Sequence, residues 1–147
     1  MSIIDDKVNA LRTFSDNINE YTKILILENE RVIIELNVEK QLFEEGVNNS
    51  GTDISSYMPY HPLTLKYKFL KRQPYDRITL RDSGDFHRSF KIIADDVEFL
   101  IFADDWKTSE LLDKYGANIL GLTDENLQIV VWEYIYPAIL SKLKQMI

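Results

Sequence analysis

The chain has 147 residues, enough for one domain with a single hydrophobic core. Its composition, 45% hydrophobic and 28% charged, is typical of a globular protein and excludes collagen-like, mucin-like and disordered chains. The absence of cysteine excludes disulfides, cysteine-ligated metal sites and thiol catalysis, and it favours a reducing cytoplasm. No apolar run reaches the roughly 18 residues of a membrane span, and the N-terminus lacks the plan of a signal peptide. We therefore expect no contact with a membrane.

The charge is unevenly distributed along the chain. The net charge of −7 argues against a free-standing nucleic-acid binder, because the phosphates would be repelled. Residues 61–91 nevertheless carry eight basic side chains against three acidic ones, so the rest of the chain is strongly acidic. A basic segment on an acidic body is complementary in charge to a second copy of the same chain. The alternative is a basic segment that only faces solvent.

The N-terminal part of the chain has a helical pattern. Residues 3–45 contain neither glycine nor proline, and their apolar positions follow one helical stripe. Asn37 could cap a short final helix, which Gly46 would close. We therefore expect residues 1–46 to form a helical arm and residues 47–147 to form the core of a single structural domain.

A connector and a short helix are expected next. The stretch at residues 47–60 is rich in Asn, Ser, Gly and Asp, which predicts an exposed, flexible connector. Pro62 suits the first turn of a helix, and Pro74 would stop that helix.

The strongest strand signal follows. Two runs rich in β-branched and aromatic residues, SFKIIA and VEFLIFA, are separated only by Asp95 and Asp96. This pattern predicts a β-hairpin over about residues 89–103. A further helix is expected after the hairpin, ending at Gly116.

A structural turn is expected just before the hairpin. Asp82 or Ser83 could cap a single turn of helix, and Gly84 would let the backbone pass into that turn. The three residues are therefore interpreted as shaping the chain rather than as catalytic groups.

The last element is predicted to be a long helix that begins after Thr123, a good N-cap with acidic residues behind it. Over residues 129–140 this helix is apolar on almost every side, and Pro137 is expected to kink it. Either the N-terminal helices cover this surface or another subunit does. Trp132 and Tyr136 are the aromatic candidates for such a subunit contact. The predicted fold class is α+β, with the small antiparallel sheet packed on this long C-terminal helix.

Few residues could carry catalysis. The two histidines, His61 and His87, are expected to be structural. One metal arrangement remains open, since Asp96, Asp105 and Lys107 loosely resemble the D…(D/E)xK pattern of magnesium-dependent nucleases. Lys107 falls beyond the strand in which those enzymes place it, so a nuclease is only the alternative. We expect no enzyme activity, no cofactor and no metal site.

The order of motifs resembles a known family. Residues 80–90, LRDSGDFHRSF, resemble the L-x-D-T/S-G-x-L/F-x-x-S signature of phage virion-morphogenesis, or tail-completion, proteins. The hairpin, a KYG segment and the ILGLTDE sequence at residues 119–125 follow in the family's order. The resemblance covers residues 80 to about 146, and the chain departs from it at residues 103–116. The upstream arm, loop and PLTLKYK helix are also similar to small neck proteins of phages of Bacteroides and relatives, including crAss-like phages.

The resemblance implies a structural virion protein, a subunit of a head–tail connector, neck or tail-completion ring of about six or twelve copies. The implied partners are copies of the chain itself and the portal, adaptor or tail-tube proteins of the same virion, without membrane or sequence-specific nucleic-acid contact. The implied location is the virion, after synthesis in the host bacterial cytoplasm. Arg77, Arg81 and Lys91 are then expected to face an acidic surface of a neighbouring subunit. A small phage-encoded interaction module, acting as a monomer or dimer, is a third possibility.

Overall fold

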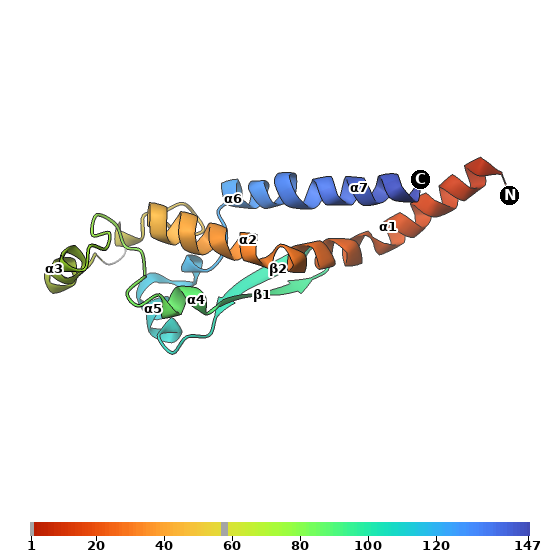
Figure 1. The fold of residues 1–147 in the computed structure, drawn as a ribbon. Helices are drawn as coiled ribbons and strands as arrows, with labels where there is room; N and C mark the ends of the chain where they lie inside the picture. Colours follow the sequence, from red (N-terminus) through yellow and green to blue (C-terminus); the bar gives the residue numbers. More distant parts are fainter. Residues whose placement is uncertain (1, 57–58) are drawn as a thin grey trace.

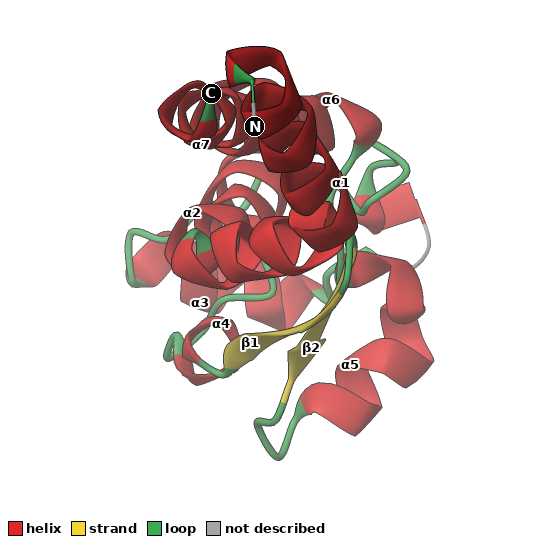
Figure 2. Ribbon diagram, turned by 90° about the vertical axis from the view of Figure 1, so that its right-hand side faces the viewer, coloured by secondary structure: helices red, strands yellow, loops and turns green. Residues whose placement is uncertain are grey.

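The computed structural model describes residues 2–56 and 59–147 as an elongated molecule made of helices and one β-hairpin (Figure 1). The C-terminal helix, the N-terminal helix and the hairpin lie one below the other as three layers (Figures 1 and 2). In chain order the elements are α1 (Ile3–Glu28), α2 (Glu30–Glu35), the π-helical segment η1 (Leu36–Glu45), the 3-10 turn η2 (Ile54–Ser56), α3 (Pro62–Leu70), α4 (Asp85–Arg88), β1 (Phe90–Asp95), β2 (Glu98–Ala103), α5 (Thr108–Tyr115), the 3-10 turn η3 (Ala117–Ile119), α6 (Asp124–Ile129), the π-helical segment η4 (Val130–Ile135) and α7 (Tyr136–Met146).

The N-terminal arm is helical, as predicted. Ser2 caps α1, because its Oγ accepts a hydrogen bond from the backbone N–H of Asp5 at 3.1 Å, and the Asp5 carboxylate reaches back to Ser2. Helices α1 and α2 and segment η1 follow one another along the arm. Ile26 and Ile33 are buried in the main hydrophobic cluster of the protein. The arm therefore contributes to the same core as the rest of the chain.

The end of the arm differs from the prediction at Asn37. This residue lies inside η1 instead of capping a helix, and its side chain is fully buried. Its amide group donates to the carbonyl of Ile119 at 3.1 Å and accepts from the N–H of Gly121 at 2.8 Å. Gly46 does close the arm, with a left-handed φ of 66°. A Cβ at that position would lie 2.9 Å from the Cβ of Arg77, so only glycine fits there.

The connector is more ordered than its composition predicts. An isolated β-bridge pairs Val47 with Asp53. The side-chain oxygen Oδ1 of Asn48 accepts hydrogen bonds from the backbone N–H groups of Ser50 and Thr52. Asn48 and Ile54 are both buried, so the prediction of an exposed connector is wrong for these two residues. Residues 57–58 of the predicted connector lie outside the described residues. The burial of the Ile54 side chain explains why the connector is ordered, because this contact holds the loop against the core.

The predicted hairpin is confirmed, with its turn shifted by one residue. Strands β1 and β2 pair antiparallel, and Asp95 pairs with Glu98. The two turn residues are therefore Asp96 and Val97 instead of Asp95 and Asp96. Asp96 has a left-handed φ of 49°, which an aspartate tolerates better than most residues do.

The fold class is α+β, as predicted, but the expectation that the hairpin packs on the C-terminal helix is wrong, because the N-terminal helices cover the hairpin instead. Strand β1 packs against α1 and α2, while α7 packs against α1. The N-terminal helix therefore lies between the hairpin and the C-terminal helix (Figure 2). Ile92 and Ile101 of the hairpin and Val130 and Ile135 of the C-terminal helix belong to one hydrophobic cluster.

The C-terminal helix begins as predicted. Thr123 Oγ1 accepts from the backbone N–H of Asn126 at 3.2 Å. Where a kink was expected, the wider π-helical segment η4 ends at Ile135, two residues before Pro137. A proline ring clashes with the carbonyl four residues earlier, so a departure from α-helical geometry is needed there. None of the helices within residues 2–56 and 59–147 is long and apolar enough to cross a bilayer.

Candidate functional site

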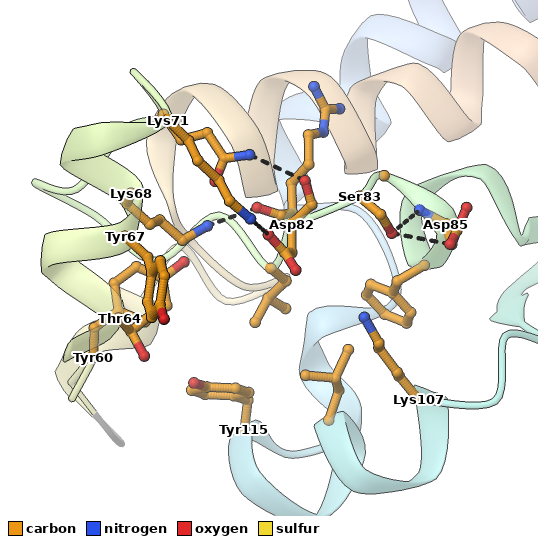
Figure 3. Close-up of a pocket in the computed structure, with 16 residues that line it drawn as sticks. Tyr60, Thr64, Tyr67, Lys68, Lys71, Asp82, Ser83, Asp85, Lys107 and Tyr115 are labelled. Carbon is orange, nitrogen blue, oxygen red and sulfur yellow. Dashed lines mark hydrogen bonds and ion pairs between the residues drawn. The ribbon is translucent and has the colours of Figure 1, made fainter.

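A cavity lies between α3, the turn before α4, and α5 (Figure 3). Its volume is about 450 Å³. Its wall combines aromatic and aliphatic side chains with charged ones, because lysines from α3 and from the segment before α5 and the carboxylates of Asp82 and Asp85 all line it. The lining includes Tyr60, Tyr67, Tyr115, Leu80, Phe86, Leu111, Lys68, Lys71 and Lys107. Such a wall offers apolar contact, while its charges are mixed in sign.

Lys68 fixes α3 at the edge of this cavity. Its side chain is almost completely buried, and Nζ donates to the carbonyl of Arg81 at 2.6 Å. The same ammonium lies 5.1 Å from the centre of the Tyr60 ring, within the range of a cation–π interaction. A buried lysine needs such partners, because an ammonium without them loses its hydration at a large cost in free energy.

The predicted structural turn forms the rim of the cavity. Gly84, with a left-handed φ of 89°, is the N-cap of α4, so the expectation that Asp82 or Ser83 caps this turn is wrong. The Oγ of Ser83 accepts from the backbone N–H of Asp85, the first residue of α4, at 3.4 Å. Asp82 forms an ion pair with Lys71 at 3.2 Å, and this pair ties the turn to the end of α3. The three residues therefore shape the chain here, with Gly84 providing the backbone freedom.

The same turn contains a charged cluster and a strained residue. The Ser83 hydroxyl donates to the Asp85 carboxylate at 2.9 Å, and Arg88 forms an ion pair with it. These hydrogen bonds, that of Ser83 first, lower the pKa of Asp85. Leu80 has a φ of 57°, which costs a leucine on the order of 1 kcal/mol or more. The strain lies directly in the cavity wall.

His87 is buried behind the turn. Burial first, and then the positive charge of Arg81, lower the pKa of His87 to about 3. The Nε of Arg81 donates to His87 Nδ1 at 3.0 Å, and another guanidinium nitrogen of Arg81 lies 2.6 Å from Glu39. The imidazole is therefore neutral at pH 7, and its bond to Arg81 gives it the structural role that was predicted. His61 is also placed structurally, since its Nδ1 caps α3 by accepting from the N–H of Leu63 at 3.1 Å.

The structure does not bring the nuclease-like residues together. Asp96 lies in the hairpin turn, whereas Asp105 and Lys107 lie beyond the opposite end of β2. At about 3.3 Å per residue, the six-residue strand β2 between the two aspartates is roughly 20 Å long. In the part of the chain that the structure describes, no group of three or more His, Cys, Asp or Glu could hold a metal ion. The geometry gives the nuclease alternative no support.

The basic residues predicted at an interface all have partners within the chain. The guanidinium of Arg77 lies 2.7 Å from Asp76 and also donates to a backbone carbonyl of η1. Arg81 is engaged with Glu39, and Lys91 lies 2.5 Å from Asp104. These three cations therefore stabilise the fold of one chain first, and a neighbouring acidic surface would have to compete with those contacts.

The aromatic residues predicted at an interface are placed differently. Trp132 and Tyr136 lie on the solvent side of the C-terminal helix, with ring centres 5.3 Å apart. Val130 and Ile135 occupy the opposite, buried side of the same helix. One chain thus covers only one face of the helix that the sequence shows to be apolar on almost every side.

The exposed apolar surface of helix α3 was not predicted from the sequence. The helix was interpreted only as part of a basic segment, but it exposes Leu63, Tyr67 and Leu70. The spacing of these residues, i, i+4 and i+7, was readable from the sequence as one helical stripe. What the sequence could not show is that this stripe points to solvent.

The candidate site is therefore a cavity beside exposed apolar surfaces, and the described residues that line it include no matched nucleophile and base. The only serine among these lining residues, Ser83, is hydrogen-bonded to Asp85, and the nearby His87, outside the lining, is bonded to Arg81. A proposal for the function must therefore rest on the lining of the cavity and on the exposed apolar surfaces. Comparison of the chain with protein-family models, curated proteins and solved structures finds no match.

Proposed function

We propose that the chain is a non-enzymatic structural subunit of a tailed phage that assembles with copies of itself into a ring of the head–tail neck or of a tail-completion complex. The observation that carries this proposal is the uncovered face of the C-terminal helix, where Trp132 and Tyr136 form an exposed aromatic pair. Removing such rings from water stabilises an association by roughly 25 cal/mol for each square ångström buried. The resemblance of residues 80 to about 146 to virion-morphogenesis proteins supports the setting in a virion.

The shape of the molecule is suited to cyclic assembly. A ring needs two different faces of each subunit that complement each other. Figure 1 shows α3 at one end of the elongated molecule and the first turns of α1 at the other. Both ends expose large apolar side chains, among them Ile3 and Ile4 on α1 and Leu63 and Leu70 on α3. Clusters of this kind are typical of protein interfaces, whereas single exposed apolar residues are ordinary.

Replacing Trp132 with glutamate tests the proposal. We expect the variant to associate at least about tenfold more weakly than the wild type, because aromatic anchors carry much of the binding energy of an interface. Sedimentation velocity over a concentration series measures this. The matched control is Trp106→Glu, since Trp106 is also exposed, at 79% against 57% for Trp132.

The control variant should associate like the wild type, and both variants should keep the wild-type melting temperature. Equal association of the wild type and both variants would show that the exposed side of the C-terminal helix, with Trp132 and Tyr136, is not an assembly surface. Subunits held together in an assembly meet at an effective concentration of about a millimolar. A wild-type chain that stays monomeric up to that concentration would favour the small interaction module instead.

A further inference from the structure

Helix α3 is inverted with respect to an ordinary surface helix. Its buried residue is a charged one, Lys68, whose side chain is 6% exposed. Leu63, Tyr67 and Leu70, spaced at i, i+4 and i+7, form one exposed stripe. We call these three residues the α3 stripe. An amphipathic helix normally places such a stripe against a core, so this one is shaped to be covered by another surface.

The charge around the α3 stripe defines the partner. Residues 61–75 contain four basic side chains and no acidic one. Lys66 and Arg72 are exposed beside the stripe, while Lys71 lies near Asp82. A surface that covers the stripe must therefore combine apolar side chains with acidic ones.

The chain itself has such a surface on α1. Ile24 and Leu27 are exposed on the side of the helix opposite the buried Thr22 and Ile26. Helical spacing places Asp16, Glu20 and Glu28 on the same solvent side, and all three are exposed. We call Asp16, Glu20, Ile24, Leu27 and Glu28 the acidic α1 face.

The two surfaces belong to different copies of the chain. Figure 1 shows α3 at one end of the molecule, beyond α2 and η1, with residues 16–28 of α1 on the far side of those segments. Segments α2 and η1, with Ile33 and Leu42 fully buried, hold this separation rigidly. A helix fixed in this way by its own chain can reach the acidic α1 face only on a neighbour.

We propose that the α3 stripe of one copy docks on the acidic α1 face of the next copy, as a repeating contact of the assembly in addition to the one made by Trp132 and Tyr136. This inference rests on the proposed function and deepens it by naming the two surfaces that meet. The contact is heterologous, because each copy uses a different surface toward each of its two neighbours. Repeating it around a closed circle gives a ring, with the basic segment of each subunit against the acidic body of the next.

A matched pair of leucine substitutions tests the apolar half of the contact. Leu63→Glu is expected to weaken association at least about tenfold, because it places a carboxylate against acidic residues and removes a buried leucine. Leu100→Glu on the hairpin is the control, since the two leucines are 62% and 63% exposed. Sedimentation velocity of both variants and the wild type measures the difference.

Disulfide trapping tests which surfaces meet. The chain contains no cysteine, so single substitutions give unambiguous cross-links. We expect a mixture of Ile24→Cys and Tyr67→Cys chains to form mixed dimers under mild oxidation, because both positions lie near the middle of their surfaces. A mixture of Ile24→Cys and Leu100→Cys chains is the control and should form at least about tenfold fewer mixed dimers.

The outcomes separate this inference from the proposed function. Trapping of the Ile24→Cys and Tyr67→Cys pair, together with loss of association for Leu63→Glu, supports the docking. Association of the wild type without that trapping overturns the docking and leaves the proposed function standing. A wild type that does not associate, with trapping no greater than in the control mixture, overturns both.

Discussion

Replacing Gln41 with methionine is expected to lower the free energy of unfolding by about 4 kcal/mol. Gln41 is fully buried in η1. Its Nε2 donates to the carbonyl of Gly121 at 2.8 Å, and its Oε1 accepts from Thr123 N at 2.9 Å and from Asn126 Nδ2 at 2.8 Å. One side chain therefore joins the end of the arm to the start of the C-terminal helix.

The effect comes from the groups that Gln41 leaves behind. Methionine has nearly the same volume, so packing changes little, but the buried amide of Asn126 and the half-buried backbone groups of Gly121 and Thr123 each lose a partner, at about 1–3 kcal/mol each. Urea unfolding followed by circular dichroism measures the loss. Gln145→Met, at an exposed position of α7, is the matched control and should change stability by less than about 0.5 kcal/mol. A loss below about 1 kcal/mol for the Gln41 variant would contradict the role of this residue.

His87 is expected to make the protein less stable in mild acid. Its pKa is lowered from 6.5 to about 3 in the folded chain, chiefly by burial. Between these two values the unfolded chain binds a proton that the folded chain does not, so stability falls as the pH falls. The wild type should lose about 2.5 kcal/mol through this residue between about pH 7 and pH 4.5.

A His87→Gln variant isolates that contribution. Glutamine can accept the hydrogen bond of Arg81 and does not titrate, so the variant should lose about 2.5 kcal/mol less than the wild type over the same pH range. Urea midpoints at the two pH values measure the difference. His61→Gln is the control, because His61 is exposed. Parallel pH profiles for the wild type and the His87 variant would show that the imidazole is not held neutral.

The elements with local signals could be predicted from the sequence. The cap at Thr123, the stop at Gly46 and the hairpin over residues 89–103 are confirmed, because each depends on neighbours within a few residues. The turn of the hairpin was placed one residue too early. Asp95 was assigned to it, but the strand continues through Asp95 to pair with Glu98.

The features that depend on distant residues could not be predicted. Asn37 was interpreted as a cap, and its actual partners are Ile119 and Gly121, more than 80 residues away. The burial of Ile54 in a loop of turn-forming residues likewise depends on the distant core. Sequence patterns indicate that a side chain will be buried or hydrogen-bonded, but the tertiary fold determines which residues are its partners.

The candidate site was predictable only in part. The aromatic residues Trp132 and Tyr136 stand out in a helix too apolar for one chain to cover, and they are exposed in the structure. The basic residues Arg77 and Arg81 stand out by charge alone, and charge does not reveal that Asp76 and Glu39 already pair with them. Net charge along a sequence therefore locates a basic segment without showing which of its cations are free.

The most direct test of the proposed structural role is mass spectrometry of purified tailed-phage particles, produced from the genome that carries the gene for this chain. Copy number is measured against the portal and major capsid proteins of the same particles. The account predicts that the chain is present at about six or twelve copies per particle, as a ring subunit would be. Its absence from intact particles would contradict the assignment to the virion.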